Sequence, residues 1–249
     1  MIEAFPRIEP FPIHIGWDPR EDEAYHVCVQ SLLNHTSIPL RIYTIDERAL
    51  RSQGLFWRPQ RKRPAGGGID IQDHKPYSTE FSFTRFLVPH LHHHGWCLFV
   101  DLDFMWRSDI VELLSRIDNQ YAVMVVKHYH DPTDVLKMDG VPQTRYPRKN
   151  WSSLILWNCD HPANVKLSLQ DVNRRAGSWL HGFEWLQDSE IGSLPESYNW
   201  LCGHSGPETE AKIVHFTQGI PTMPEHMFEP YAEEWREIYS GANAVTIGD

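Results

Sequence analysis

Short apolar segments of strand length alternate with amphipathic segments of helix length along most of this chain. The expected strands cover residues 13–17, 40–45, 96–100, 121–126 and 154–157. The expected helices begin at an N-cap on Asp18, run from Ser78 or Thr79 to Gly95, and cover residues 110–117, 164–176 and 183–191. This alternation predicts an α/β fold with a mainly parallel central sheet and helices on both faces. Ligands of such sheets bind at the carboxyl ends of the strands.

Two stretches lack a clear period. Residues 53–77 carry Arg61-Lys62-Arg63, then Pro64 and three glycines, which is typical of a long loop. That basic stretch is compatible with a lid over an anionic ligand, although a solvated loop is the commoner explanation. The C-terminal third is rich in Pro, Gly and Trp and is hard to assign to elements.

The most strand-like apolar run ends in two acidic residues. Residues 96–105 read W-C-L-F-V-D-L-D-F-M, and this is the one Asp-x-Asp triplet in the chain. Side chains alternate along a strand, so Asp101 and Asp103 are expected to face the same way. Two such carboxylates suit a divalent cation, which can hold a diphosphate. The alternative is a polar strand end or a helix cap before Ile110.

Composition excludes several classes of function. The net charge of −10 disfavours a broad nucleic-acid footprint. No apolar stretch is long enough to span a bilayer, and the N-terminus does not read as a signal peptide. The four cysteines show no paired metal spacing, which makes a reducing cytoplasm the expected location. The histidines at 90, 92, 93 and 94 fit a helix C-terminus better than a metal site.

Several motifs recur in one order. They are Asp18, S-F-T-R-F-L-V-P-H-L from Ser82, the D-L-D triplet, S-S-L-I-L-W-N, L-Q-D-S-E-I-G and V-H-F-T-Q-G. In this order the chain resembles the nucleotide-sugar glycosyltransferases of the GT-A fold, and within them the retaining glycogenin and bacterial galactosyltransferase group. The resemblance spans roughly residues 13–224. It implies a single glycosyltransferase domain over residues 1–249, with a donor-binding part at about 10–118, an acceptor and catalytic part at about 119–226, and a tail at 227–249.

The resemblance also implies a metal site and a set of donor contacts. Asp101, Asp103 and His215 would bind Mn²⁺, or Mg²⁺, since carboxylate oxygens and a neutral imidazole suit such a cation. Without the motif, His215 would read as a buried polar residue. The implied donor-binding residues are Trp17, Asp18, Arg20, Arg85, Asp101, Leu102, Asp103, Lys149, Asn150, Ser152, His215 and Gly219.

The implied catalytic residues are Gln187 and Asp188, which match the end of the family's D-Q-D. The glutamine would lie beneath the anomeric carbon and the aspartate would contact sugar hydroxyls. Leu186 replaces the first aspartate, and Glu184 or Glu190 could substitute for it. The alternative for Gln187 and Asp188 is a solvated helix face.

Two further positions depart from the family pattern. Asn150 is displaced by one residue from the usual Asn-Ala-Gly, and no lysine follows Gly219 to hold the diphosphate. Lys149, Arg148 or Arg20 are candidates to replace that lysine.

The sequence therefore predicts a metal-dependent hexosyltransferase. The donor would be a nucleotide diphosphate sugar, expected to be a uridine one, and the resemblance implies retention of configuration. The acceptor would be an unidentified hydroxyl on a glycan, lipid, protein or modified nucleic acid. The alternatives are a sugar-1-phosphate nucleotidyltransferase and a catalytically inactive nucleotide-sugar-binding module. The former would carry a glycine-rich basic loop after its first strand, where this chain has W-D-P-R-E-D.

Overall fold

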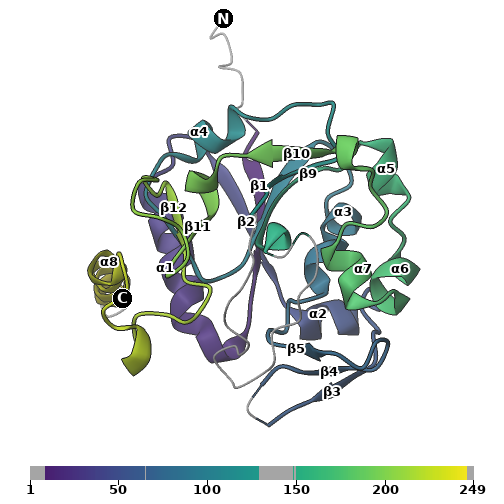
Figure 1. Ribbon diagram of the computed structural model, residues 1–249, viewed down its shortest axis with the longest axis horizontal. Coiled ribbons are helices and arrows are strands. Elements are labelled where there is room, and N and C mark those ends of the chain that lie inside the picture. Colours follow the sequence, from purple (N-terminus) through teal and green to yellow (C-terminus); the bar gives the residue numbers. More distant parts are fainter. Residues whose placement is uncertain (1–8, 65, 129–147, 149, 246–249) are drawn as a thin grey trace, which may run out of the picture.

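The computed structural model describes residues 9–64, 66–128, 148 and 150–245. A six-stranded central sheet has the order β10-β8-β9-β6-β1-β2 (Figure 1). Its strands are β1 (Phe11–Gly16), β2 (Leu40–Ile45), β6 (Trp96–Val100), β8 (Val123–Val126), β9 (Leu154–Asn158) and β10 (Ile191–Leu194). The pairs β1·β2, β1·β6 and β8·β10 are parallel, whereas β9 is antiparallel to both of its neighbours. The prediction of a mainly parallel sheet is confirmed.

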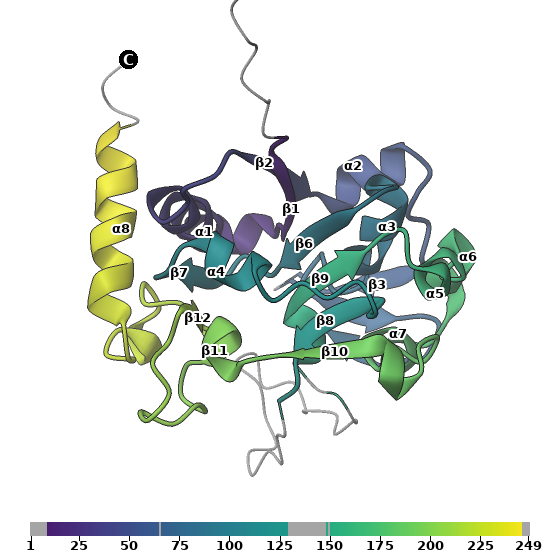
Figure 2. The same ribbon diagram turned by 90° about the horizontal axis from the view of Figure 1, so that it is seen from above.

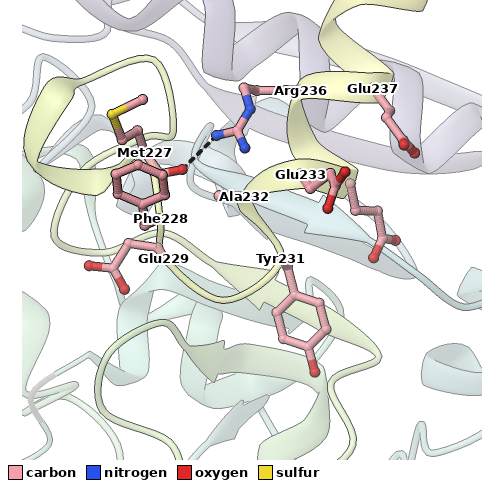
Figure 3. Close-up of a pocket in the computed structure, with 9 residues that line it drawn as sticks. Met227, Phe228, Glu229, Tyr231, Ala232, Glu233, Arg236 and Glu237 are labelled. Carbon is pink, nitrogen blue, oxygen red and sulfur yellow. Dashed lines mark hydrogen bonds between the residues drawn. The ribbon is translucent and has the colours of Figure 1, made fainter.

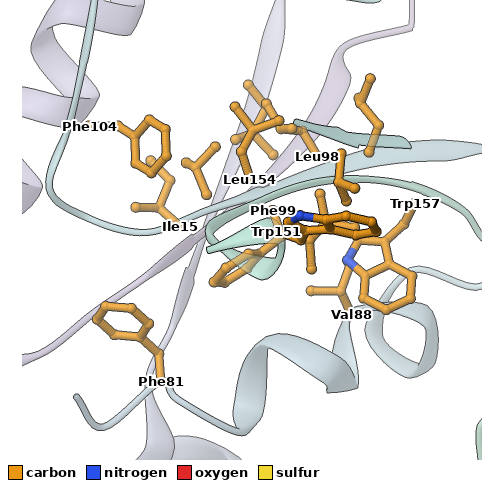
Figure 4. Close-up of a cluster of buried hydrophobic side chains, with 14 of the residues drawn as sticks. Ile15, Phe81, Val88, Leu98, Phe99, Phe104, Trp151, Leu154 and Trp157 are labelled. Carbon is orange, nitrogen blue, oxygen red and sulfur yellow. The ribbon is translucent and has the colours of Figure 1, made fainter. Parts of the chain in front are cut away.

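The central strands form where both faces are apolar. Four of the five residues of β6 and all five of β9 are buried, as a strand covered on two sides requires. Figure 4 shows Leu98 and Phe99 of β6 within the apolar cluster, and Val88 close to Trp157 of β9. Burial of apolar side chains on both faces therefore stabilises the sheet and fixes where its strands end.

Helices cover both sides of this sheet. The longest are α1 (Asp22–Asn34) and α8 (Ala232–Val245), which pack on each other on one side, while α5, α6 and α7 lie on the other (Figure 2). The shorter helices are α2 (Glu47–Ser52), α3 (Val88–Leu91), α4 (Ile110–Leu114), α5 (Pro162–Val165), α6 (Leu169–Arg174) and α7 (Gly177–His181). The 3-10 turns are η1 (Pro19–Glu21), η2 (Thr84–Leu87), η3 (Trp151–Ser153), η4 (Asp188–Glu190), η5 (Glu196–Asn199) and η6 (Pro224–His226). Among the described helices, none is both long enough and apolar enough to cross a bilayer.

A second sheet begins with the strand that follows β6 in the chain. Its order is β11-β12-β7, from β7 (Phe104–Trp106), β11 (Trp200–Leu201) and β12 (Ile213–His215). Strand β12 runs antiparallel to β7, with His215 opposite Phe104. This pairing brings the C-terminal histidine beside the Asp-x-Asp triplet.

The prediction of a loop over residues 53–77 is wrong. The segment contains a small antiparallel sheet of β3 (Gln60–Lys62), β4 (Gly68–Asp70) and β5 (Pro76–Tyr77). Its strands are short and polar, so no periodic signal marks them. Glycines 66 and 67 adopt positive φ in the turn, at 95° and 59°, which glycine accepts without strain. The buried Arg58 clamps Asp70 through two hydrogen bonds of 2.9 and 2.6 Å.

Three helix predictions need correction. The segment after Ser78 is a turn, in which Ser82 N–H bonds the Thr79 carbonyl, and helical structure begins only at Thr84. Residues 164–176 divide into α5 and α6, because a capping box on Ser168 starts a new helix. Residues 183–191 are not a helix: Phe183 has a φ of 51°, and Ile191 already begins β10.

Candidate functional site

The acidic triplet lies between β6 and β7, where the chain passes from one sheet to the other. The Asp101 N–H bonds the Ser153 carbonyl at 2.9 Å, and the Asp103 carbonyl accepts from Phe216 N–H at 3.0 Å. Leu102 between them is fully buried, which directs the two flanking carboxylates away from the core. Leu102 can therefore offer a ligand only its backbone.

His215 completes a group with the two carboxylates. Its Nε2 lies 3.3 Å from Asp103 Oδ1, and its ring stacks on Phe104 with centroids 4.3 Å apart. One ligand atom from each of Asp101, Asp103 and His215 falls within 4.8 Å of the others. Among the described residues this is the one group of three or more such side chains close enough to hold a metal ion, and the histidines at 90–94 form none.

The chemistry of this group fits a divalent cation. The Oδ1 atoms of Asp101 and Asp103 are buried, and a basic side chain lies beside each: Arg85 Nη1 is 2.8 Å from Asp101 Oδ1 and His215 Nε2 is 3.3 Å from Asp103 Oδ1. Buried carboxylates are normally neutralised, and one arginine beside two aspartates leaves negative charge that a bound cation would offset. Oxygen ligands with one imidazole suit Mn²⁺ or Mg²⁺.

Arg85 supplies a close positive charge beside Asp101. Its Nη1 lies 2.8 Å from Asp101 Oδ1 as an ion pair, while the same nitrogen donates to the Ser152 carbonyl at 2.7 Å. The Arg85 side chain is 6% exposed, and its guanidinium packs near the rings of Phe81 and Phe99. Burial raises the pKa of Asp101 despite this arginine, and the neighbouring Asp103 raises it further.

Glu21, at the end of η1, is a third carboxyl that the sequence did not single out. Burial raises its pKa to about 8, and the negative charges of Asp103 and Asp18 add to the effect. In sequence Glu21 read as the third residue after a helix cap. Its position just beyond the carboxyl end of β1 is the signal that could have marked it.

Asp18 and its neighbours form a fixed network. Asp18 caps η1 as predicted, accepting from Arg20 N–H at 3.1 Å. The Arg20 side chain donates to the same carboxylate at 3.0 and 2.7 Å, and Glu80 N–H donates at 3.1 Å. Trp17 Nε1 bonds Asp22 at 2.8 Å. Asp18 is wholly buried, so this carboxylate holds Arg20, whose side chain is 32% exposed.

In the segment that resembles D-Q-D, the two polar residues are exposed to solvent and the apolar residue is buried. Leu186 is buried, whereas Gln187 and Asp188 are exposed where η4 begins. Asp188 pairs with Arg148. Glu190 accepts from Gln187 N–H at 2.7 Å, which gives it a capping role.

Arg148 connects this segment to the loop before β9. Its guanidinium packs over Trp151, 5.6 Å from the ring centroid, and Ser152 Oγ lies 2.8 Å from His181 Nδ1. Asn150 adopts a left-handed conformation with a φ of 63°. Lys149 lies outside the described residues.

Gly219 follows His215 in a turn closed by its own N–H, which bonds the Phe216 carbonyl at 3.1 Å. The structure thus brings together Asp101, Asp103, His215, Arg85 and Ser152 at one end of the central sheet.

A separate cavity of about 600 Å³ lies against α8 (Figure 3). It is lined by Met227, Phe228, Glu229, Tyr231, Ala232, Glu233, Glu234, Arg236 and Glu237. None of the predicted site residues lines it.

Comparison with known proteins fixes the family and the fold. No protein-family model matches the chain. It is 46% identical over 233 residues to Protein CDI of Arabidopsis thaliana, covering 91% of this chain and 85% of that protein. The chain belongs to the Protein CDI family.

Solved structures add the fold. The glycosyltransferase GlyE of Streptococcus pneumoniae TIGR4 superposes with a TM-score of 0.58 at 17% identity, covering 92% of this chain. This chain spans only 60% of the GlyE chain. The galactosyltransferase LgtC, solved with donor and acceptor sugar analogs, superposes with a TM-score of 0.56 at 12% identity, covering 93% of this chain and 96% of its own. The chain therefore has the GT-A fold, as the sequence resemblance implied.

Proposed function

We propose that this protein is a metal-dependent glycosyltransferase. It would transfer a hexose from a nucleotide diphosphate sugar, expected to be a uridine one, to an unidentified hydroxyl acceptor with retention of configuration. The observation that carries this proposal is the group of Asp101, Asp103 and His215, whose ligand atoms lie within 4.8 Å of one another, in a GT-A fold. The complex of LgtC with donor and acceptor sugar analogs supports the same class of substrate.

The proposed donor site follows the strand ends. A divalent cation bound by Asp101, Asp103 and His215 would offset the charge that develops on the departing diphosphate. Arg85 holds Asp101 in place and adds a positive charge beside it. Trp17, Asp18 and Arg20 would form the nucleotide side, at the end of β1. This assignment divides the domain into a donor-binding part at about 10–118 and an acceptor part at about 119–226.

The sugar side of the site would come from the acceptor part. Asn150 and Ser152 precede β9, and Gln187 and Asp188 would act on the hexose itself. Gly219 and Lys149 complete the proposed donor contacts. Interactions with the reacting sugar lower the barrier only where they are stronger in the transition state, so these residues should affect turnover most.

A different cation must replace the family's lysine after Gly219. Arg20 and Arg148 are both held by one carboxylate, Asp18 and Asp188 respectively. A guanidinium fixed in this way loses less conformational freedom on binding a phosphate than a free lysine would. Arg20 and Arg148, with Lys149, are therefore the proposed replacements. A cytoplasmic location stays a prediction from the cysteines, all four of which are free and buried.

A thermal-shift screen tests the proposal. Uridine, guanosine and adenosine diphosphate sugars are each added with Mn²⁺, with Mg²⁺ or with a chelator. A uridine diphosphate hexose should raise the melting temperature only when the metal is present, because the cation bridges protein and diphosphate. A ligand at 100 times its Kd contributes about 2.7 kcal/mol of stability.

Variants and product analysis separate the alternatives. Asp103→Ala should abolish the metal-dependent shift, whereas Asp118→Ala, at an exposed turn, should retain it. Slow metal-dependent release of uridine diphosphate without acceptor supports a transferase. Release of pyrophosphate from a nucleoside triphosphate and a sugar phosphate would support a nucleotidyltransferase instead. Metal-independent binding of the donor would refute the proposed role of the triplet.

A further inference from the structure

A chain of buried hydrogen bonds reaches His215 from the loop before β9. Ser153 Oγ donates to the Asn150 carbonyl at 2.8 Å. Asn199 Nδ2 donates to Ser153 Oγ at 2.9 Å, and Asn199 Oδ1 lies 2.9 Å from His215 Nδ1. The side chains involved are almost inaccessible: Ser153 is 4% exposed, Asn199 0% and His215 3%. Water therefore has little access to these bonds.

The direction of every bond in this chain follows from its first member. The Asn150 carbonyl can only accept, so it uses the single hydroxyl proton of Ser153. Ser153 Oγ must then accept from Asn199, which turns the amide nitrogen toward Ser153 and the amide oxygen toward the imidazole. An amide oxygen can only accept, so His215 Nδ1 must carry a proton. In the neutral ring, Nε2 is then the nitrogen with the free lone pair.

We propose that Asn199, oriented by Ser153, is a positioning residue that fixes His215 in its Nδ1–H tautomer. The unprotonated Nε2 faces Asp103 at 3.3 Å and is thereby available as a metal ligand. A metal-bound histidine commonly donates its other ring N–H to an oxygen that sets its tautomer. The inference rests on the proposed metal site for its purpose, but the tautomer itself can be measured without metal.

Ring position and ring protonation have different causes here. The stack on Phe104 and the β7·β12 register fix where the imidazole lies. Neither contact distinguishes one ring nitrogen from the other. Without the amide, the proton could move to Nε2 and bond Asp103, which would block the ligand atom. Asn199 therefore controls which form of an already placed ring is present.

The loop before β9 joins the same network. The Ser153 carbonyl accepts from Asp101 N–H at 2.9 Å, so one serine contacts the backbone of one proposed ligand and orients the amide that serves another. A purely structural role for Asn199 would predict lower stability after its loss, with the tautomer and metal affinity unaffected.

The first test is the tautomer. Metal-free protein with ¹⁵N-labelled histidine is studied by NMR at a pH where His215 is neutral, and the signal is assigned with His215→Gln. The wild type should show a protonated Nδ1 and an unprotonated Nε2, the form less populated in free histidine. Asn199→Leu should shift the ring to the Nε2–H form. Asn199→Asp should retain Nδ1–H, because a carboxylate also accepts from it.

The second test is Mn²⁺ affinity, measured by calorimetry on folded protein. Asn199→Leu should weaken Mn²⁺ binding about 10–100-fold, the usual effect of losing such an outer partner. Asn199→Asp should bind at least as tightly as the wild type. Asn173→Leu is the matched control, since Asn173 is equally buried but bonds the Leu55 and Leu169 carbonyls far along the chain from the site.

Ser153→Ala keeps the proposal testable if Asn199→Leu does not fold. It removes only the hydroxyl, so the amide is free to turn and the ring should populate both tautomers. An Nε2–H ring in the wild type, or an unchanged tautomer and Mn²⁺ affinity in both variants, overturns the proposal. If the tautomer changes as expected but the wild type binds no Mn²⁺, the positioning role of Asn199 is supported and the proposed metal site is refuted.

Discussion

Glu21→Gln should make the metal-free protein more stable at neutral pH. Burial and the carboxylates of Asp103 and Asp18 raise the pKa of Glu21 from 4.5 to about 8. At pH 7 the folded protein therefore keeps Glu21 protonated, whereas the unfolded chain ionises it. Ionisation of Glu21 in the unfolded chain stabilises the unfolded state, which lowers the free energy of unfolding of the wild type. A glutamine does not ionise, so the variant avoids this loss.

The size of this effect follows from the pKa. A carboxyl whose pKa is raised by folding contributes its full stability below the unfolded value, and loses it as pH rises through the folded value. Each pH unit between 4.5 and 7 contributes about 1.4 kcal/mol. Glu21→Gln should therefore add at most about 3 kcal/mol at pH 7, more at pH 8, and almost nothing at pH 4.

Urea unfolding of chelator-treated protein from pH 4.5 to 8 measures this difference. The two proteins should have similar stability at the acid end and diverge as pH rises. Glu237→Gln is the control, because it makes the same exchange at an exposed position of α8. A variant less stable than the wild type at pH 7, or a gain that does not change with pH, would refute the reasoning. Saturating Mn²⁺ should reduce the pH dependence of the wild type.

Three other predictions concern stability and turnover. Burial lowers the pKa of His14 to about 4, so the stability that its neutral form provides is complete above pH 6.5 and is lost as pH falls toward 4. In urea titrations, His14→Phe should remove about 3 kcal/mol of this destabilisation by acid. Arg58→Met should cost about 3–5 kcal/mol by leaving Asp70 buried without its partner, and adding Asp70→Leu should recover much of it. Gln187→Ala and Asp188→Asn should slow transfer far more than they weaken uridine diphosphate binding, and unchanged turnover in both would move the sugar contacts elsewhere.

Local apolar pattern was enough to predict five of the six strands of the central sheet, but it missed β10, whose first residue was assigned to a helix. The strand at 40–45 has the predicted bounds, and β6 ends directly before Asp101, as the apolar run indicates. The prediction for residues 53–77 failed because the strands there are polar and only two or three residues long. Their pairing depends on a glycine turn and on the contact of Arg58 with Asp70, and neither leaves a periodic trace in sequence.

The candidate site was predictable to the extent that its residues sit in motifs. Asp101 and Asp103 were marked by their place after the apolar run, although they lie in a turn and not in the strand that the alternation argument assumed, and His215 followed from the resemblance. Asn199 could not be predicted from the sequence, because its role depends on two partners, Ser153 and His215, that folding brings together from distant segments. A polar residue between Tyr198 and Trp200, in an otherwise apolar run, was the one available signal.

The balance of charge around the triplet is the strongest physical reason to expect a cation. Asp101, Asp103 and Glu21 bring three carboxyl groups into a mostly buried space, and burial opposes the ionisation of Asp101 and Glu21. Arg85 is paired with Asp101, whereas Arg20, which also acts on Glu21, is already paired with Asp18. With all three carboxyls ionised, the excess is two negative charges, which one divalent cation neutralises. Several carboxylates buried together destabilise a fold unless their charge is neutralised, and a bound divalent cation supplies the charge that Arg85 leaves unbalanced.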